Sequence, residues 1–235
     1  MVARDIDFAL ERGARHALIG PNGAGKTSLI NLIAGVLAPS FGAVMLNGDD
    51  ITRSGQAERV KLGVARTFQI NQLFRGLTVL ENACLPVAER RGTARVAWRP
   101  LAAYPEIAEE ALAVLATLEL EDDALTPVRE LPYGRQRLVE IAIALASRPQ
   151  VLLLDEPAAG VPSAERHIIL DVLDGLPEDI AVLIVDHAMD VVFRFAREIT
   201  VMVGGAILTG GPPEAIAADE RVRAVYLGQA GDSYG

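Results

Sequence analysis

Hydrophobic residues form short continuous runs near both ends of the chain and follow helical spacing in the middle. The runs at 151–154 and 181–185 are apolar on successive positions, which is typical of central strands in a parallel sheet, and residues 16–19 can supply a further buried strand. Residues 6–19 are predicted as two strands joined at 11–13, and residues 43–46 as a short strand closed by the turn pair Asn47 and Gly48. The pattern predicts an α/β fold.

The middle of the chain, from about residue 71 to 128, is predicted to be helical. One helix opens at Pro105 and buries Ile107, Ala111, Val114, Leu115 and Leu118. We therefore expect one domain over 1–235, with an α/β core formed by 1–70 and 134–235 and a helical subdomain inserted at about 71–133.

Other elements flank that region. Residues 58–69 are predicted as a helix followed by a strand that ends at Gln69. Residues 138–147 predict a helix that is buried on most sides. Gly204 and Gly205 join two short strands, and a final helix is expected to begin near Pro213.

A glycine-rich loop at residues 20–27 fits G-x-x-x-x-G-K-[ST] at every fixed position, between an apolar run and a helix-like segment. Such a loop directs backbone N–H groups at phosphate oxygens, at a helix N-terminus that favours anions. Lys26 is expected to reach the β- and γ-phosphates, and the Thr27 hydroxyl to ligate Mg²⁺. A chance Gly-rich turn is the alternative, expected in roughly one chain in a hundred of this length. The predicted nucleotide-binding residues are Gly20, Pro21, Asn22, Gly23, Ala24, Gly25, Lys26, Thr27 and Ser28.

A second motif follows the apolar run at 151–154, where Asp155, Glu156 and Pro157 end a predicted strand. A carboxylate at the end of a buried strand near a phosphate loop can hold Mg²⁺ through water. The adjacent Glu156 is placed to polarise an attacking water. Without the loop at 20–27, a solvated strand end is the competing interpretation.

Composition narrows the choice of partners. The net charge of −9 and the pI near 4.9 argue against nucleic acid as the main partner. His16, His167 and His187 lack metal-site spacing, and Cys84 is the single cysteine. No stretch reaches eighteen uninterrupted apolar residues. We expect a cytoplasmic protein that associates with a membrane only through a partner.

Three further segments complete a series of five motifs. They are Gln69 after one predicted strand, residues 131–137 before the buried helix, and His187 after another strand. In order, the five motifs resemble the Walker A loop, Q-loop, signature, Walker B and switch histidine of the ATP-binding cassette (ABC) ATPases. The resemblance implies a P-loop fold with a RecA-like core, an inserted helical subdomain and a small antiparallel β part. It implies ATP hydrolysis with Mg²⁺, with Glu156 as general base and His187 at the γ-phosphate. Gln69 would sense Mg²⁺, so the implied metal set is Thr27, Gln69 and Asp155.

Residues 65–69, 77–82, 155–160 and 225–228 look more specifically like the branched-chain amino acid importer ATPases. Importers of urea and short amides share much of this pattern. The resemblance implies two ATPase subunits, identical or different, closing head-to-tail so that Tyr133 and Gly134 complete the partner's site. It also implies a transmembrane permease gripped by the helical subdomain, a solute-binding protein acting indirectly, and a place on the inner face of the cell membrane. A non-transport ABC protein and a regulatory subunit without turnover are the alternatives.

Two departures from the family pattern affect these expectations. The signature carries Pro132 where a serine is usual, and proline offers neither hydroxyl nor N–H. The weakened site would be the partner's, which makes a heterodimer with unequal sites natural. The usual aromatic residue that stacks on adenine lies upstream of the position matching Asp5, whereas Phe8 follows it. Either the chosen start codon lies too far downstream, or adenine binding is weak.

Overall fold

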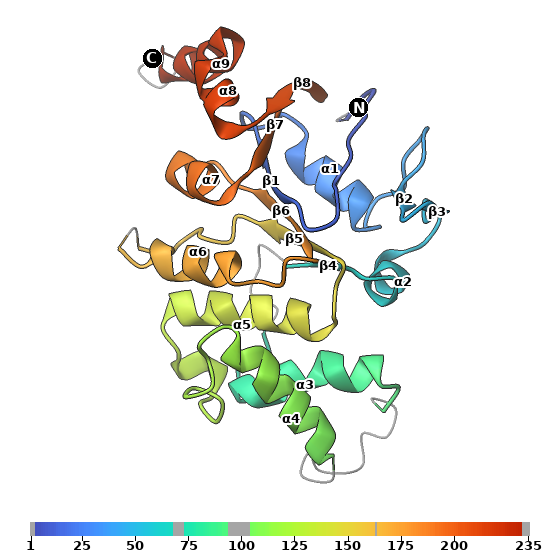
Figure 1. The fold of residues 1–235 in the computed structure, drawn as a ribbon, viewed down its shortest axis with the longest axis vertical. Helices are drawn as coiled ribbons and strands as arrows, with labels where there is room; N and C mark the ends of the chain where they lie inside the picture. The colour runs from blue at the N-terminus through green and yellow to red at the C-terminus, as the bar shows by residue number, and fades with distance from the viewer. Residues whose placement is uncertain (1–2, 68–72, 94–103, 163, 232–235) are drawn as a thin grey trace.

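The computed structural model describes residues 3–67, 73–93, 104–162 and 164–231. Six strands form one sheet in the order β4-β5-β6-β1-β7-β8 (Figure 1). The first five strands in this order are parallel, and β8 runs antiparallel to β7. The strands are β1 (Arg15–Ile19), β4 (Val64–Arg66), β5 (Val151–Asp155), β6 (Ala181–Val185), β7 (Glu198–Val203) and β8 (Ala206–Gly211).

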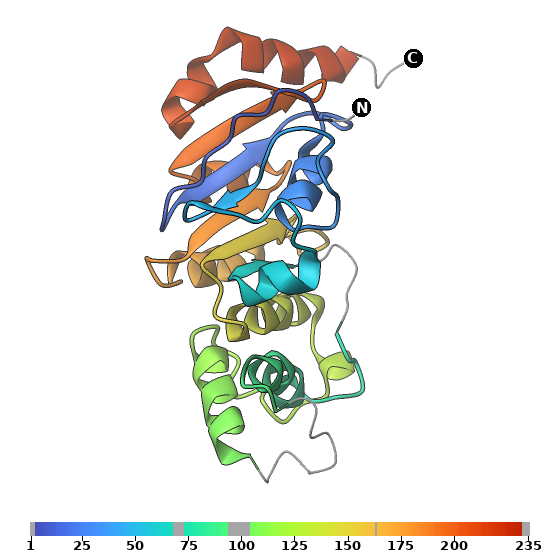
Figure 2. The ribbon, with the colours of Figure 1, turned by 90° about the vertical axis from the view of Figure 1, so that its right-hand side faces the viewer.

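Helices lie on the two sides of the strands in Figure 1, and Figure 2 views the sheet from the side of its N-terminal helix. On one face, α1 (Lys26–Ile33) packs Leu29 and Ile30 against Leu18, Leu153 and Leu183. The opposite face is covered by α5 (Tyr133–Ala146), α6 (Arg166–Asp174) and α7 (Met189–Phe195). The parallel strands are buried on both sides, so their apolar runs are continuous, as predicted.

The middle of the chain forms helices at the end of the molecule away from β8 (Figure 1). There α3 (Val79–Arg90) and α4 (Pro105–Ala116) pack against each other and against α5, followed by the short η3 (Val128–Glu130). Ile107, Ala111 and Leu115 are buried, as the helical spacing predicted, with Pro105 as the first residue of α4. A reciprocal capping box between Thr78 and Glu81 begins α3.

Three predicted elements differ from the structure. Residues 6–14 form no strand; Ile6, Phe8 and Leu10 pack against the core on the α1 side, and their alternation reflects this one-sided contact. The predicted final helix is two, α8 (Pro213–Ala218) and α9 (Glu220–Gly231), because the Asp219 carboxylate accepts from the Arg221 N–H and starts a new helix. The strand predicted to end at Gln69 ends at Arg66, and Phe68 and Gln69 lie outside the described residues.

A small antiparallel hairpin, β2 (Met45–Leu46) and β3 (Asp49–Asp50), turns at Asn47 and Gly48 as predicted. It is tied to α1 by Arg59, a fully buried residue of α2 (Gln56–Lys61). The guanidinium donates to five backbone carbonyls, two of which belong to the last turn of α1. The acceptors are Leu32, Ile33, Ile51, Ser54 and Thr52.

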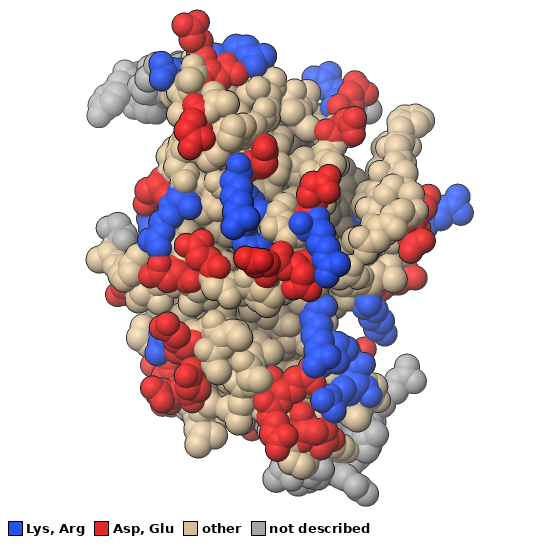
Figure 3. All heavy atoms as spheres, viewed as in Figure 1, with Lys and Arg blue, Asp and Glu red and all other residues tan. Residues whose placement is uncertain are grey.

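The outer surface mixes charges of both signs. On the face shown in Figure 3, acidic side chains are interspersed with Lys and Arg. Within the part of the chain that the structure describes, no helix has the length and apolarity to cross a membrane.

Candidate active site

The loops after β1, β5 and β6 meet at the carboxyl end of the parallel strands, where open α/β sheets bind ligands. A pocket of about 180 Å³ opens there. It is lined by residues 22–28 together with Asp155, Glu156 and Val185. The structure thus brings together most of the predicted nucleotide-binding loop and the two predicted carboxylates, which are far apart in the sequence.

The loop at 20–27 has the backbone geometry of an anion cradle. Gly25, with φ 102°, is the N-cap of α1, and the first turn of this helix contains no acidic side chain and no side-chain cap. The N–H groups of that turn are therefore open to an anion. Gly20 has φ 150°, and a Cβ there would lie 2.1 Å from the carbonyl oxygen of Met202. This position requires glycine.

Lys26 lies across the loop. Its Nζ donates to the carbonyls of Gly20 at 2.6 Å and Pro21 at 3.0 Å. Burial lowers the pKa of Lys26, and the carboxylates of Glu156 and Asp155 offset part of that effect. The ammonium group is therefore held at the pocket by loop carbonyls and by the field of two acids.

Asp155 is the last residue of β5, and its side chain is 1% exposed. Its Oδ2 accepts from Nη2 of Arg66 at 2.9 Å. Its Oδ1 is buried with no hydrogen-bond partner among the described residues. An acceptor left open beside a phosphate loop and the Thr27 hydroxyl fits the oxygen chemistry of Mg²⁺.

Glu156 takes φ 50°, a left-handed conformation that is costly for a residue with a side chain. A 2.7 Å hydrogen bond from its N–H to the Val185 carbonyl ties it to β6. The Nδ1 of His187 lies 3.5 Å from Glu156 Oε1. Asp186 fixes the start of this loop, because its Oδ1 accepts from the N–H groups of His187 and Ala188, while burial raises the pKa of Asp186.

Tyr133 and Gly134 are not among the residues that line this pocket. They occupy the first turn of α5, with Pro132 as N-cap at φ −55° and ψ 151°. The Tyr133 ring packs over Gly160, where a Cβ would come within 2.9 Å of it. Gln69 lies outside the described residues, so its expected role stays a prediction.

Sequence reasoning assigned no role to three residues at the site. Arg66 bonds both Asp155 and the Asn31 side chain of α1. A charged residue inside an otherwise apolar strand was the available signal for it. On α9, burial raises the pKa of Tyr226, and the backbone of Gly20 offsets part of the effect.

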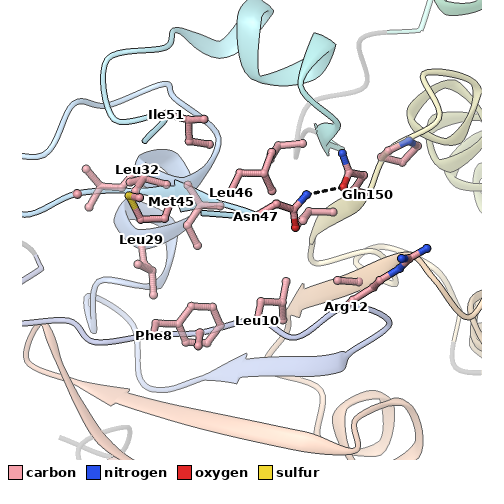
Figure 4. Close-up of a pocket in the computed structure, with 18 of the residues that line it drawn as sticks. Phe8, Leu10, Arg12, Leu29, Leu32, Met45, Leu46, Asn47, Ile51 and Gln150 are labelled. Carbon is pink, nitrogen blue, oxygen red and sulfur yellow. Dashed lines mark hydrogen bonds between the residues drawn. The ribbon is translucent and has the colours of Figure 1, made fainter. Parts of the chain in front are cut away.

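A second and larger hollow, a groove of about 1630 Å³, lies along the α1 side of the sheet (Figure 4). Phe8 and Leu10 face Leu29 and Met45 across it. The Phe8 ring also meets the His16 ring edge-on, at 5.1 Å between centroids. Phe8 is thus engaged with the core and is absent from the lining of the phosphate-loop pocket.

A phosphate loop after the central strand β1, with two acids at the end of β5 on the far side of β6, defines the class as a P-loop ATPase. The family model described as "ABC transporter" matches residues 3–159. The chain belongs to the ABC transporter family, as its ATP-binding, ATP-hydrolysing subunit.

Relatives with curated descriptions include branched-chain amino acid transport proteins. The probable ATP-binding protein LivG of Archaeoglobus fulgidus is 35% identical over 95% of this chain and 88% of its own length. The high-affinity transport ATP-binding protein BraF of Pseudomonas aeruginosa is 33% identical over 98% and 93%. The ribose import ATP-binding protein RbsA 2 of Rhizobium etli is 35% identical over 94% of this chain but only 42% of its own length.

Solved structures agree with the fold. The ATP-binding cassette MJ1267 in its ADP conformation has a TM-score of 0.82 at 32% identity, covering 97% of this chain and 92% of that one. The dimeric structure of the bacterial ABC transporter cassette MJ0796 has a TM-score of 0.75 at 26% identity, covering 90% of each chain.

Proposed function

We propose that this chain energises an importer of branched-chain amino acids or related small nitrogen compounds. The proposed ATP hydrolysis rests on one observation. The phosphate loop, Asp155, Glu156 and His187 come together at the carboxyl ends of the parallel strands. Urea or short-amide uptake is the nearest alternative for the solute.

In the proposed reaction, the first turn of α1 and Lys26 bind the phosphates of ATP. Thr27, the open Oδ1 of Asp155 and Gln69 would hold Mg²⁺, which when bound neutralises charge on the phosphate oxygens. Glu156 accepts a proton from the attacking water, and its left-handed backbone directs the carboxylate toward His187. His187, whose side chain is 70% exposed, is free to turn toward the γ-phosphate.

A second ATPase subunit is proposed to complete the site. The pocket of about 180 Å³ is small beside the roughly 300–1,000 Å³ of typical ligand sites. Tyr133 and Gly134 lie outside it and are proposed to face the pocket of the partner. The dimeric MJ0796 cassette supports such a pairing.

The helical region around α3 is proposed as the docking surface for a transmembrane permease on the cytoplasmic side of the membrane. Phe74 is 60% exposed just before α3. Its backbone is held on both sides by the buried Asn82, which accepts from the Phe74 N–H and donates to the Phe74 carbonyl. A rigidly presented aromatic side chain suits a protein contact. A solute-binding protein would act through that permease.

Uptake of labelled solutes tests the proposed import. Cells of the source organism carrying Lys26→Ala in place of the native chain are expected to lose leucine uptake and keep ribose uptake. The matched control is Lys61→Ala, a change at an exposed residue of α2, which should leave both rates unchanged. Loss of ribose or urea uptake with leucine uptake intact would contradict the assigned solute.

A further inference from the structure

Arg66 joins the three segments that carry the chemistry of the site. It is the last residue of β4, its side chain is 9% exposed, and it donates to Asp155 of β5 and to Asn31 of α1. The strand β4 leads toward the predicted Q-loop, β5 ends in the Walker B acid Asp155, and α1 begins within the phosphate loop. Among the described residues, no other side chain donates a hydrogen bond to the Asp155 carboxylate.

Strand geometry explains why this arginine reaches Asp155. Side chains alternate along a strand, so Val64 and Arg66 share a face, as do Leu153 and Asp155. Val64 and Leu153 belong to the core on the α1 side of the sheet. Arg66 and Asp155 therefore project toward α1, where Asn31 accepts the second guanidinium contact.

The two oxygens of Asp155 are used differently. Oδ2 is occupied by the guanidinium at 2.9 Å, whereas Oδ1 is buried and has no hydrogen-bond partner among the described residues. A planar guanidinium that bonds both Asp155 and Asn31 restricts rotation of the carboxylate more than a lysine would. Residues that orient a metal-binding carboxylate in this way adjust the affinity of the site for its metal ion.

We propose that Arg66 is a positioning residue: by holding Oδ2 and anchoring to Asn31, it presents Oδ1 of Asp155 toward the metal that accompanies the nucleotide. The inference rests on the proposed ATPase site and adds a specific determinant of its metal affinity. Arg66 touches neither nucleotide nor reacting atoms in this scheme. Its effect is carried through Asp155.

The test measures metal binding without turnover. Mn²⁺ is titrated by electron paramagnetic resonance into the full chain saturated with a non-hydrolysable ATP analogue, with analogue binding also measured in EDTA. Arg66→Met is expected to raise the half-saturating Mn²⁺ concentration about 10- to 100-fold, the usual effect of losing an orienting partner. Affinity for the analogue in EDTA should change less than about threefold, because the phosphate loop is untouched.

Two further variants separate positioning from folding. Arg66→Lys keeps the charge and should give an intermediate Mn²⁺ affinity, because one ammonium cannot bond Asp155 and Asn31 as a fork does. Glu140→Gln breaks a comparable buried pair, Arg137 with Glu140 at 2.8 Å, and should lower the melting temperature without changing Mn²⁺ affinity.

Unchanged or tighter Mn²⁺ binding in folded Arg66→Met or Arg66→Lys would overturn the proposal and leave a purely structural ion pair. Failure of the wild-type chain to bind the analogue with Mn²⁺ would instead contradict the proposed function. The two failures are therefore distinguishable.

Discussion

Replacing Pro132 with serine is expected to raise ATP turnover without altering stability. Pro132 is the N-cap of α5 and supplies no side-chain cap. A serine at this position, with φ −55° and ψ 151° already suited to a cap, should add about 1 kcal/mol. Loss of proline rigidity in the unfolded chain costs about 0.4–1 kcal/mol. The two terms nearly cancel, so the melting temperature should move by less than about 3 °C.

The effect on turnover has a different origin. The new hydroxyl would donate one hydrogen bond to a charged phosphate oxygen, an interaction worth about 1.5–3 kcal/mol. If the bond forms only in the transition state, turnover rises by about 10- to 150-fold. The lower end is expected, because Tyr133 beside it is 41% exposed and the region is open to solvent.

Mixed dimers of differently tagged copies locate the effect. One copy carries Lys26→Ala, so only the phosphate loop of the other copy is active. Turnover should rise when Pro132→Ser is on the copy with the disabled loop, and stay constant when it is on the copy with the active loop. A rise confined to the second arrangement would refute the assignment of the signature to the partner's site.

Two predictions concern stability. Burial lowers the pKa of His16 to about 4, so between its ordinary value and that pH the unfolded chain takes up a proton that the folded chain does not. Unfolding free energy should therefore fall by about 2 kcal/mol between pH 7 and pH 5 in urea titrations, and the fall should vanish in His16→Gln; an equal fall in both proteins would assign the loss to other groups. Arg59→Met should cost at least about 4 kcal/mol, because five backbone carbonyls lose a charged donor. In calorimetry this corresponds to a fall in melting temperature of about 8–16 °C, against less than about 2 °C for the control Lys61→Met at an exposed residue. Similar falls in both variants would contradict the argument from burial.

The parallel sheet and the phosphate loop were predictable because their signals are local. Continuous apolar runs report burial on both faces, and the loop at 20–27 has fixed residue types at fixed spacing. Whether residues 6–14 form a strand could not be predicted from such a local signal. Alternating apolar residues indicate packing on one side. Ile6, Phe8 and Leu10 pack in this way against the core, although their segment does not form a strand.

The pair between Arg66 and Asp155 shows the limit for the site. The two residues lie 89 positions apart, and only the neighbouring places of β4 and β5 in the sheet bring them together. The left-handed backbone of Glu156 is similarly invisible in the sequence, since it depends on the bond to Val185 across strands. The local sequence motif was enough to predict Asp155 and Glu156 as site residues, whereas the orientation of their side chains depends on tertiary contacts.

The central claim is that the site at the carboxyl ends of the parallel strands hydrolyses ATP, with Glu156 as general base. The most direct measurement compares steady-state ATP hydrolysis and ATP–Mg²⁺ binding in the wild-type chain and in Glu156→Gln. Removing a general base typically costs about 10²–10⁴-fold, so turnover should nearly vanish while binding stays largely intact. Turnover within about threefold of the wild type would contradict the role of Glu156 and with it the proposed reaction.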